Sequence, residues 1–413
     1  MDCGAEHEPA SIWRCECGGL LDVVTTDIEI TRAELDRRAR SRKKPYNSGV
    51  WLYKELVHPL VRDDLIVTRP EGNTNIYAHA RVSEFAGIAK LSMKHEGENP
   101  TGSFKDRGMT VGISEARRLG HKAVGCASTG NTSASLASYA ALCGMRSVVF
   151  IPSGEIAYGK LAQAMAFGAR VLQIRGNFDD AMRIVQEACG RLGLYLLNSI
   201  NPWRIEGQKS IAFELIQQLR WKPPDWVIVP AGNLGNTSAI GKALVELRDL
   251  ALIEHLPRLA AVQAEGANPF YSMWKEGLER PPTLAKPETL ASAIRIGNPV
   301  SWKRAMRAIK ATNGVVEQVS DQEIMDAKAV IDSSGIGCEP ASAASLAGAK
   351  RLRERGIISS DDSVVCILTG NILKDPGATV DYHTGKINGI EPRYKNAPVE
   401  VPPDIESVMK ALR

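Results

Sequence analysis

The 413-residue sequence contains no run of about 18 or more consecutive apolar residues, the length that a membrane-spanning helix needs. Its first residues, MDCGAEHEPASIWRC, lack the basic stretch followed by an apolar stretch that marks a secretory leader. The sequence also has no low-complexity tract and no repeat of solenoid period. These absences argue against membrane, exported and repeat proteins, and we expect a soluble, cytoplasmic protein.

The sequence also lacks a strong excess of either charge, because its formal net charge is only +4. This balance is compatible with an anionic small substrate and is too weak to argue for nucleic acid. An apolar content of 44% with 24% charged residues is typical of a globular protein, here of two or three domains. The most basic stretch, RAELDRRARSRKKP, is interpreted as a solvated helix face or linker, with a partner-binding patch as the alternative.

Cysteine pairs at disulfide-like spacings are missing from most of the chain. Five of the eight cysteines stand alone in apolar or helix-like segments: Cys126, Cys143, Cys189, Cys338 and Cys366. Isolated cysteines in such segments behave as small hydrophobic residues and indicate a reducing compartment. The other three, Cys3, Cys15 and Cys17, crowd the N-terminus and need a separate explanation.

Apolar strand-like runs alternate with helical patterns from residue 122 onward. One series contains AVGCAS, RSVVFIP and RVLQIRG, and a second contains DWVIVPAG, LAAVQAEG and SVVCILTG. Such alternation is the signature of parallel sheets covered by helices. The sequence therefore predicts two α/β units with a cleft between them.

The stretch NPTGSFKDRG places one lysine, Lys105, between an aromatic ring and an acid after a turn-rich entry. A lysine in the first turn of a helix is mildly unfavourable, because the helix dipole is positive there. Lys105 is therefore either an ordinary exposed lysine or one held in a partly desolvated site, where it can lose its proton and form a Schiff base.

Two further turns join an apolar strand to a helix and could bind anions. In VIVPAGNLGNTS, residues 232–236 precede a helix start whose backbone N–H groups suit a phosphate. The turn in ASTGNTSAS offers four polar side chains: Ser128, Thr129, Asn131 and Thr132. Hydroxyl and amide groups there could bind a carboxylate or a phenolic oxygen. For residues 232–236, a tight turn that needs glycine is the alternative explanation. With Lys105, the two turns suggest a phosphate-bearing cofactor and an acidic substrate.

Eight motifs stand in the order found in threonine synthases: NPTGSFKDRG, CASTGNTSAS, GNFDDA, NSINPWRIEGQK, GNLGN, IRIGNPVSW, CEPASAAS and LTGN. The chain resembles these pyridoxal-phosphate enzymes over roughly residues 50–380. SFKDRG alone also fits dehydratases, whereas the longer motifs together are more specific. The resemblance implies the α/β architecture called fold type II, or tryptophan synthase β-like, in which two parallel-sheet domains hold the cofactor in the cleft between them.

The same resemblance assigns the residues around the cofactor. It implies that Lys105 holds pyridoxal 5'-phosphate as a Schiff base and that Phe104 packs at the ring. Asn131 would bond the phenolic oxygen, and Thr369 would face the pyridine nitrogen, where a neutral threonine makes the ring a weaker electron sink than an aspartate would. The cofactor phosphate would lie in a segment that we call the glycine loop, formed by Gly232, Asn233, Leu234, Gly235 and Asn236.

The implied reaction converts O-phospho-L-homoserine and water to L-threonine and phosphate, the last step of threonine biosynthesis and the work of a carbon–oxygen lyase acting on phosphates. Lys105 would serve as general base and acid. The substrate phosphate needs charged donors. The candidates for substrate binding are Asn198, Ser199 and Arg204, with Lys160 and Lys209 as helpers and with Ser128, Thr129 and Thr132 near the substrate carboxylate. A surface ion pair is the alternative explanation of Arg204.

The sequence divides into three expected parts. Residues 1–45 form an N-terminal extension, residues 46–85 and 205–413 form a large cofactor-binding domain, and residues 86–204 form a small domain that carries the Schiff-base lysine. The resemblance favours a homodimer that binds a small-molecule substrate, with no nucleic-acid or membrane partner.

The N-terminal extension holds an incomplete zinc motif. Relatives with such an extension often carry Cys-x-x-Cys followed by Cys-x-Cys-Gly-Gly, whereas this chain has Cys15 and Cys17 before two glycines but only Cys3 upstream. A structural zinc site needs four ligands. Either His7 is the fourth ligand, or the true start lies upstream, or the site has been lost.

Two other functions remain open at this stage. Another fold type II enzyme, such as a threonine or serine dehydratase or a cysteate-synthase-like paralogue, would share Lys105 and the glycine loop but would not need the donors near Arg204. A zinc-ribbon nucleic-acid-binding protein would use Cys15, Cys17 and the basic run near Arg37, but it leaves the long α/β pattern unexplained.

Overall fold

Two parallel sheets form two α/β units in the computed structural model, which describes residues 3–153, 158–175 and 178–412. The larger sheet has the strand order β1-β2-β10-β7-β8-β9, and only the β1–β2 pair is antiparallel. Its strands are β1 (Ile76–Tyr77), β2 (Lys90–His95), β7 (Trp226–Pro230), β8 (Arg258–Ala264), β9 (Val315–Val319) and β10 (Ser363–Leu368). The smaller sheet is parallel throughout and has the order β5-β4-β3-β6. These sheets confirm the predicted fold class.

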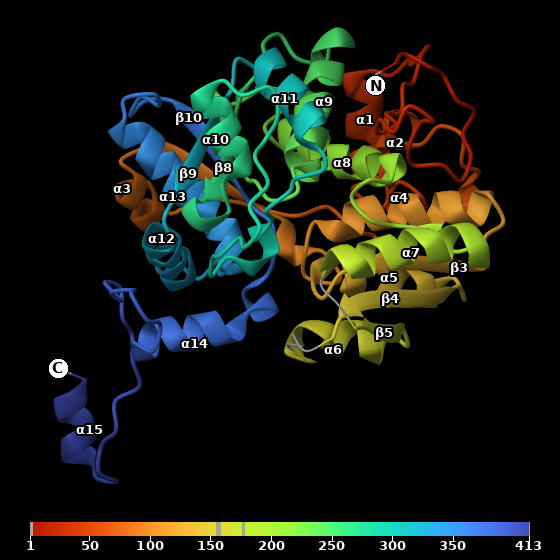
Figure 1. The fold of residues 1–413 in the computed structure, drawn as a ribbon. Helices are drawn as coiled ribbons and strands as arrows, with labels where there is room; N and C mark the ends of the chain where they lie inside the picture. Colours follow the sequence, from red (N-terminus) through yellow and green to blue (C-terminus); the bar gives the residue numbers. More distant parts are fainter. Residues whose placement is uncertain (1–2, 154–157, 176–177, 413) are drawn as a thin grey trace.

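Helices cover both faces of the larger sheet, because its central strands are apolar on both sides. In β7, Val227 and Val229 belong to one core, while Trp226 and Ile228 belong to the other, as the two-residue period of a strand requires. The helices of this unit are α3 (Ala80–Ala86), α8 (Pro202–Gln218), α9 (Gly235–Asp249), α10 (Pro269–Glu276), α11 (Trp302–Ala311), α12 (Asp321–Ser333) and α13 (Pro340–Glu354). Figure 1 shows α8, α9 and α11 on one side of the sheet and α3, α12 and α13 on the other.

The smaller unit lies beside the larger one and contains the ASTGNTSAS turn (Figure 1). Its strands are β3 (Ala123–Ala127), β4 (Arg146–Pro152), β5 (Arg170–Ile174) and β6 (Tyr195–Leu196). Its helices are α4 (Lys105–Arg118), α5 (Asn131–Leu142), α6 (Tyr158–Ala166) and α7 (Phe178–Leu192). The expected domain boundary at residue 86 is too early, because β2 pairs with β1 and β10 of the larger sheet.

Close contact between α4 and α8 joins the two units. A Cβ atom on Gly108 of α4 would lie 2.6 Å from the backbone oxygen of Arg204, and one on Gly207 of α8 would lie 2.1 Å from the backbone oxygen of Arg107. Only glycine permits helix backbones to approach this closely. The contact therefore brings the helix that begins at Lys105 against the helix that carries Arg204.

The N-terminal segment reaches both units before α1 (Arg32–Ala39) and α2 (Lys54–Val57). Trp13 and Leu20 pack on the core beneath the smaller sheet, while Asp22 pairs with Lys242 of α9. The basic run does not form a uniformly exposed face: Arg37 is exposed, but Arg38 is buried and pairs with Glu34 and Glu55. This inward arginine corrects the expectation of a simple solvated helix and weakens the nucleic-acid hypothesis.

The remaining elements complete the chain. The short 3₁₀ helices are η1 (Trp51–Tyr53), η2 (Asp63–Leu65), η3 (Glu96–Glu98), η4 (Glu265–Ala267), η5 (Ser292–Ile294) and η6 (Ile372–Lys374). Helix α14 (Pro376–Thr384) packs below the larger unit, and α15 (Ile405–Ala411) stands apart at the C-terminus (Figure 1). Within the described ranges, no helix is both long and apolar enough to span a membrane. All eight cysteines are described and are free thiols, as predicted for the five isolated ones.

Candidate active site

Lys105 is the first residue of α4 and lies where that helix meets the end of β10. The segment before it pairs with the segment after β10, because Phe104 N–H donates to the Thr369 carbonyl at 3.1 Å and Ser103 bridges Gly370. The Lys105 Nζ atom lies 3.9 Å from the centre of the Phe104 ring. The structure thus places three residues predicted to contact the cofactor, Lys105, Phe104 and Thr369, at one junction.

The environment of Lys105 favours a neutral amine. Burial, together with the nearby Arg204 guanidinium, lowers the pKa of Lys105 to about 7, although the Glu339 carboxylate acts in the opposite direction. A neutral amine is nucleophilic and can exchange protons near physiological pH. The alternative that Lys105 is an ordinary exposed lysine is therefore wrong.

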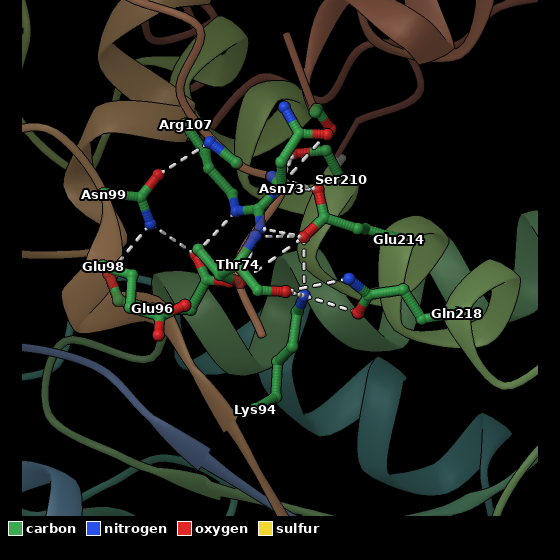
Figure 2. A network of polar contacts seen from close by, with 12 residues as sticks. Asn73, Thr74, Lys94, Glu96, Glu98, Asn99, Arg107, Ser210, Glu214 and Gln218 are labelled. Atoms are coloured by element: carbon green, nitrogen blue, oxygen red, sulfur yellow. Dashed lines mark hydrogen bonds and ion pairs between the residues drawn. The ribbon is translucent and has the colours of Figure 1, made fainter. Parts of the chain in front are cut away.

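A buried network of ions fixes the first turn of α4 (Figure 2). Arg107 pairs with Glu96 at 2.6 Å and with Glu214 at 2.9 Å, and Lys94 pairs with the same Glu214 at 2.5 Å. Each of these charges has a partner of opposite sign, which offsets the cost of removing it from water. Because Arg107 lies two residues after Lys105, the network holds the lysine's backbone in place.

Asp106 makes a second set of contacts on the same turn. Its carboxylate accepts hydrogen bonds from Thr101 N–H at 2.7 Å and from the hydroxyls of Thr101 and Ser135 at 2.6 and 2.5 Å. Burial raises the pKa of Asp106 to about 6. Both neighbours of Lys105 on the C-terminal side, Asp106 and Arg107, are therefore structural residues that hold the motif in its loop-to-helix shape.

The glycine loop lies between β7 and α9. Leu234 adopts a left-handed conformation with φ 65°, and no side chain caps the start of α9. The first N–H groups of a helix have no partner within the helix. Asn233 anchors the loop, because its Nδ2 donates to Ser199 Oγ at 2.7 Å and its Oδ1 accepts from Val300 N–H at 2.8 Å. Three of the resemblance motifs thus meet at this loop.

Buried polar atoms next to this loop fit a bound phosphate. Both side-chain polar atoms of Asn236, the Thr237 hydroxyl and Gln208 Oε1 are buried, and no described residue hydrogen-bonds them. Such atoms are costly unless a ligand or water satisfies them. A Cβ on Gly235 would lie 3.9 Å from Gln208 Oε1, which places Gln208 beside the loop. Asn236 Nδ2 and the Thr237 hydroxyl are donors, so with the helix start they suit the phosphate of pyridoxal phosphate, whereas the amide oxygens of Asn236 and Gln208 are acceptors that need another partner.

Thr237 and Gln208 were missed by the sequence analysis. Each stands in a quoted motif, GNLGNTS and EGQK, but nothing in a single sequence distinguishes a buried polar residue that lacks a partner from an ordinary helix residue. Only the packing of α8 against the start of α9 reveals them.

Asn131 and Thr369 approach one another through Glu339, which is also absent from the sequence-based list. Asn131 Nδ2 donates to the two Glu339 oxygens at 3.0 and 3.3 Å, and the Thr369 hydroxyl donates to Glu339 Oε1 at 3.2 Å. The residues predicted to contact the phenolic oxygen and the pyridine nitrogen therefore lie within reach of a single buried carboxylate.

Arg204 is a buried cation with almost no compensation. Its side chain is 2% exposed, its Nη1 donates only to the Leu197 carbonyl at 3.0 Å, and its Nε has no partner among the residues placed by the structure. Burial lowers the pKa of Arg204 to about 10. A surface ion pair, the alternative left open by the sequence, is therefore wrong.

The other predicted substrate residues differ in what their side chains contact. Ser199 lies beside the glycine loop through Asn233, whereas Asn198 uses its amide on the backbone of Ala127, at 2.9 and 3.0 Å. Lys209 pairs with two carboxylates, Glu206 at 2.6 Å and Glu246 at 2.7 Å. These ion pairs leave Lys209 no free charge for a substrate, so the structure does not support its predicted role.

The remaining predictions concern two other segments. Ser128, Thr129 and Thr132 lie half-buried at the turn between β3 and α5, in the predicted position around Asn131. Lys160 belongs to α6, but its side chain is outside the described part of the structure.

The N-terminal thiols gather into one cluster, as the zinc hypothesis requires. The sulfur atoms of Cys3, Cys15 and Cys17 all lie within 4.8 Å of one another. Cys3 Sγ and Cys15 Sγ are 3.5 Å apart, and His7 Nε2 is 3.2 Å from Cys15 Sγ. Three thiols and one imidazole form a donor set that suits tetrahedral zinc.

Comparisons with known proteins agree with this geometry. The sequence matches the family described as "Pyridoxal-phosphate dependent enzyme" over residues 67–370. The threonine synthase of Methanocaldococcus jannaschii is 47% identical over 382 residues, which cover 92% of this chain and 93% of that protein. Threonine synthase 2, chloroplastic, of Arabidopsis thaliana is 41% identical over 416 residues, covering 97% of this chain and 81% of that protein.

Solved structures show the same fold at low identity. The threonine synthase from Escherichia coli has a TM-score of 0.70 at 18% identity and covers 98% of this chain and 95% of that chain. Maize serine racemase has a TM-score of 0.64 at 22% identity and covers 78% of this chain and 92% of that chain. At these identities, the solved structures establish the fold alone.

The fold, the half-buried, desolvated lysine and the family match together define a pyridoxal-phosphate-dependent enzyme of fold type II. Within that class, the chain belongs to the threonine synthases.

Proposed function

We propose that this enzyme converts O-phospho-L-homoserine and water to L-threonine and phosphate, as a carbon–oxygen lyase acting on phosphates. The observation that carries the proposal is the buried Arg204, which has no carboxylate partner among the described residues and influences the charge of Lys105. A buried cation without a counter-ion is costly, and an anionic ligand removes that cost. A substrate phosphate supplies such an anion beside the reactive lysine.

The residues of this chain supply binding and proton transfer. Bound pyridoxal phosphate would supply a ring that withdraws electrons from the substrate carbons. Lys105 would hold the cofactor, then take the α-proton at Nζ and deliver protons later in the reaction, as its pKa near 7 allows. Asn131 and Thr369 would orient the ring, and the glycine loop with Asn236 would hold its phosphate.

Phosphate leaves from the γ-carbon and water adds at the β-carbon in this proposed reaction. Arg204 would hold the leaving phosphate through charge-assisted hydrogen bonds. In this proposal the start of α9 holds the cofactor phosphate, with Ser199 on Asn233 of the glycine loop, and the Arg204 side chain of α8 holds the substrate phosphate.

A threonine or serine dehydratase is the alternative within the same fold. Its substrate carries no phosphate, so Arg204 would stay buried without a counter-ion during turnover. The deciding assay compares O-phospho-L-homoserine, L-threonine and O-phosphoserine as substrates. We expect threonine and inorganic phosphate in equal amounts from O-phospho-L-homoserine. Faster formation of 2-oxobutyrate from threonine would instead establish the dehydratase.

Replacing Gly235 with valine should weaken cofactor binding more than folding. A Cβ at this position would lie 3.4 Å from the end of the Ile205 side chain, so the neighbours can adjust, but the added methyl groups would crowd the phosphate site. We expect the dissociation constant for pyridoxal phosphate to rise ~10-fold or more, because phosphate hydrogen bonds are lost. The unfolding temperature of the cofactor-free protein should change little.

Two other glycines serve as comparisons for that experiment. The sequence predicts the same behaviour for Gly232, but the structure does not, because a Cβ there would lie 2.9 Å from Ile294 Cα and would force the backbone to move. Gly232→Val should therefore lower the unfolding temperature even without cofactor. Gly377 has open space around it, so Gly377→Val is the neutral control. An equal loss of stability in the Gly235 and Gly232 variants would show that Gly235 serves only the turn.

We also propose that Cys3, His7, Cys15 and Cys17 bind one zinc ion. Elemental analysis of protein purified under reducing conditions should give about one zinc per chain. Cys15→Ser should lose that zinc, whereas Cys143→Ser, which changes an isolated thiol, should keep it. Wild-type protein that stays free of zinc after incubation with zinc would contradict this site.

Other properties stay predictions. They are the homodimeric state, the cytoplasmic location and the absence of nucleic-acid and membrane partners. Sedimentation velocity tests the homodimeric state, and a salt-dependent binding titration with DNA and RNA tests the absence of a nucleic-acid partner.

A further inference from the structure

Glu339 connects residues of the two units at the site where the cofactor is expected. Its side chain is only 4% exposed and accepts hydrogen bonds from Asn131, at the start of α5 in the smaller unit, and from Thr369, after β10 in the larger unit. Asn131 Nδ2 contacts both Glu339 oxygens, and a single N–H shared between them would satisfy this contact, since a primary amide nitrogen carries two N–H groups. In that arrangement Glu339 orients Asn131 and leaves its second N–H for a ligand.

The backbone holds the Glu339 carboxylate in this position. Glu339 occupies the N-cap position of α13 without a side-chain capping bond, Pro340 begins that helix, and Glu339 N–H donates to the Gly370 carbonyl at 3.0 Å. A Cβ on Gly370 would lie 2.5 Å from the carboxyl carbon of Glu339, so only glycine lets the carboxylate lie against this turn. Ser342 bonds the Thr369 hydroxyl at 3.0 Å and fixes the other side of that residue.

Two cations face the Glu339 carboxylate from different elements. They are Lys105, at the start of α4, and Lys374, in η6. Burial raises the pKa of Glu339, while the hydrogen bonds from Asn131 and Thr369 and the charges of these two lysines act in the opposite direction. The other charges nearby are Arg204, which acts on Lys105, and Asp106, which acts on Lys374. Glu339 is thus the carboxylate that offsets the effect of Arg204 on Lys105.

We propose that Glu339 is a positioning residue of the active site, which holds Asn131 and Thr369 in place at the cofactor ring. This inference rests on the proposed function, because it assumes that the cofactor binds among Lys105, Asn131 and Thr369. The competing explanation is that Glu339 only bridges α5 and α13 and stabilises the fold. A positioning residue would change cofactor binding when it is substituted, whereas a purely structural residue would change only the unfolding temperature.

Two substitutions separate the charge of Glu339 from its hydrogen bonds. Glu339→Gln keeps the shape and an acceptor oxygen but removes the charge, whereas Glu339→Ala removes both. The matched control is Glu354→Gln, the same change at the exposed end of the same helix, where Glu354 pairs with Lys350. Each full-length variant is prepared without cofactor and then mixed with pyridoxal phosphate over a range of pH.

We expect Glu339→Gln to move the pH midpoint of cofactor uptake ~0.5–1 unit lower, because the lost negative charge had stabilised the Lys105 ammonium. Glu339→Ala should raise the dissociation constant for pyridoxal phosphate ~10-fold. In cofactor-free protein it should also speed hydrogen exchange in the first turn of α5, while Glu354→Gln should match wild type.

The results that would overturn the inference are distinct from a failure of the proposed function. If both Glu339 variants take up cofactor with wild-type midpoint and affinity, Glu339 has no role toward the cofactor. If Glu339→Ala lowers only the unfolding temperature, the bridge is purely structural. A wild-type protein that takes up no pyridoxal phosphate on Lys105 would refute the proposed function itself, and this inference with it.

Discussion

Lys105→Ala should abolish measurable conversion of O-phospho-L-homoserine, with a loss of at least ~10³-fold in kcat, because it removes both the cofactor attachment and the proton carrier. Phosphate release measures the activity. Borohydride should fix the cofactor covalently on Lys105 in the wild-type protein, which a peptide map detects. Lys122→Ala, which changes an exposed lysine beyond the end of α4, should keep full activity. A label on any other lysine would contradict the assignment.

The pKa of Lys105 adds a pH dependence to this prediction. An ordinary lysine stays protonated until pH values near 10.4, whereas burial and Arg204 lower the pKa of Lys105 to about 7. The neutral amine is the form that attacks the cofactor, so uptake by cofactor-free protein should accelerate as the pH rises through about 7 and then level off. A rate that still rises above pH 9 would indicate an ordinary exposed lysine.

Arg204→Ala should lower kcat/KM for O-phospho-L-homoserine by ~10² or more, which corresponds to a lost charged hydrogen bond of roughly 3 kcal/mol. Cofactor attachment at Lys105 should persist, because we assign the cofactor phosphate to the start of α9 and not to Arg204. Any residual turnover of L-threonine, which carries no phosphate, should change far less. The ratio of the two activities therefore measures the effect on phosphate recognition and not on the enzyme as a whole.

Stability provides the control for the Arg204 experiment. A buried cation without a counter-ion costs free energy, so Arg204→Met, which keeps much of the side-chain volume, should leave the unfolding temperature of the ligand-free protein unchanged or higher. A marked fall in that temperature would show that Arg204 serves the fold through its bond to Leu197. A retained kcat/KM in both variants would remove Arg204 from the substrate site.

Zinc binding and the roles of Gly235 and Glu339 are independent of these two results. The cluster of Cys3, Cys15 and Cys17 lies in the N-terminal extension, and elemental analysis measures whether it holds zinc. The Gly235 and Glu339 experiments measure cofactor binding. Together the measurements separate loss of cofactor, loss of substrate recognition and loss of folding.

Local sequence patterns determined which elements form and which backbone segments turn. Alternating apolar strands and helices were sufficient to predict two parallel α/β units, because the periods of a strand and a helix are local properties. Lys105 and the glycine loop were also predictable, since a loop-to-helix lysine and a strand–glycine–helix turn carry their chemistry within a few residues. The prediction that one cofactor uses both rests on the order of the motifs.

Tertiary structure alone decided which polar side chains lack partners and which are already paired. Lys209 and Arg204 lie five residues apart on α8, yet Lys209 meets two carboxylates, whereas Arg204 meets none in the part of the chain that the structure describes. The sequence did not place strand β2 in the larger sheet, because its partner β10 lies far along the chain and no local pattern specifies such a pairing. Glu339 came under consideration only through its contacts with Asn131 of α5 and with Thr369 after β10, which lie far from it in the sequence. Burial and charge compensation depend on long-range packing, so no local pattern can specify them.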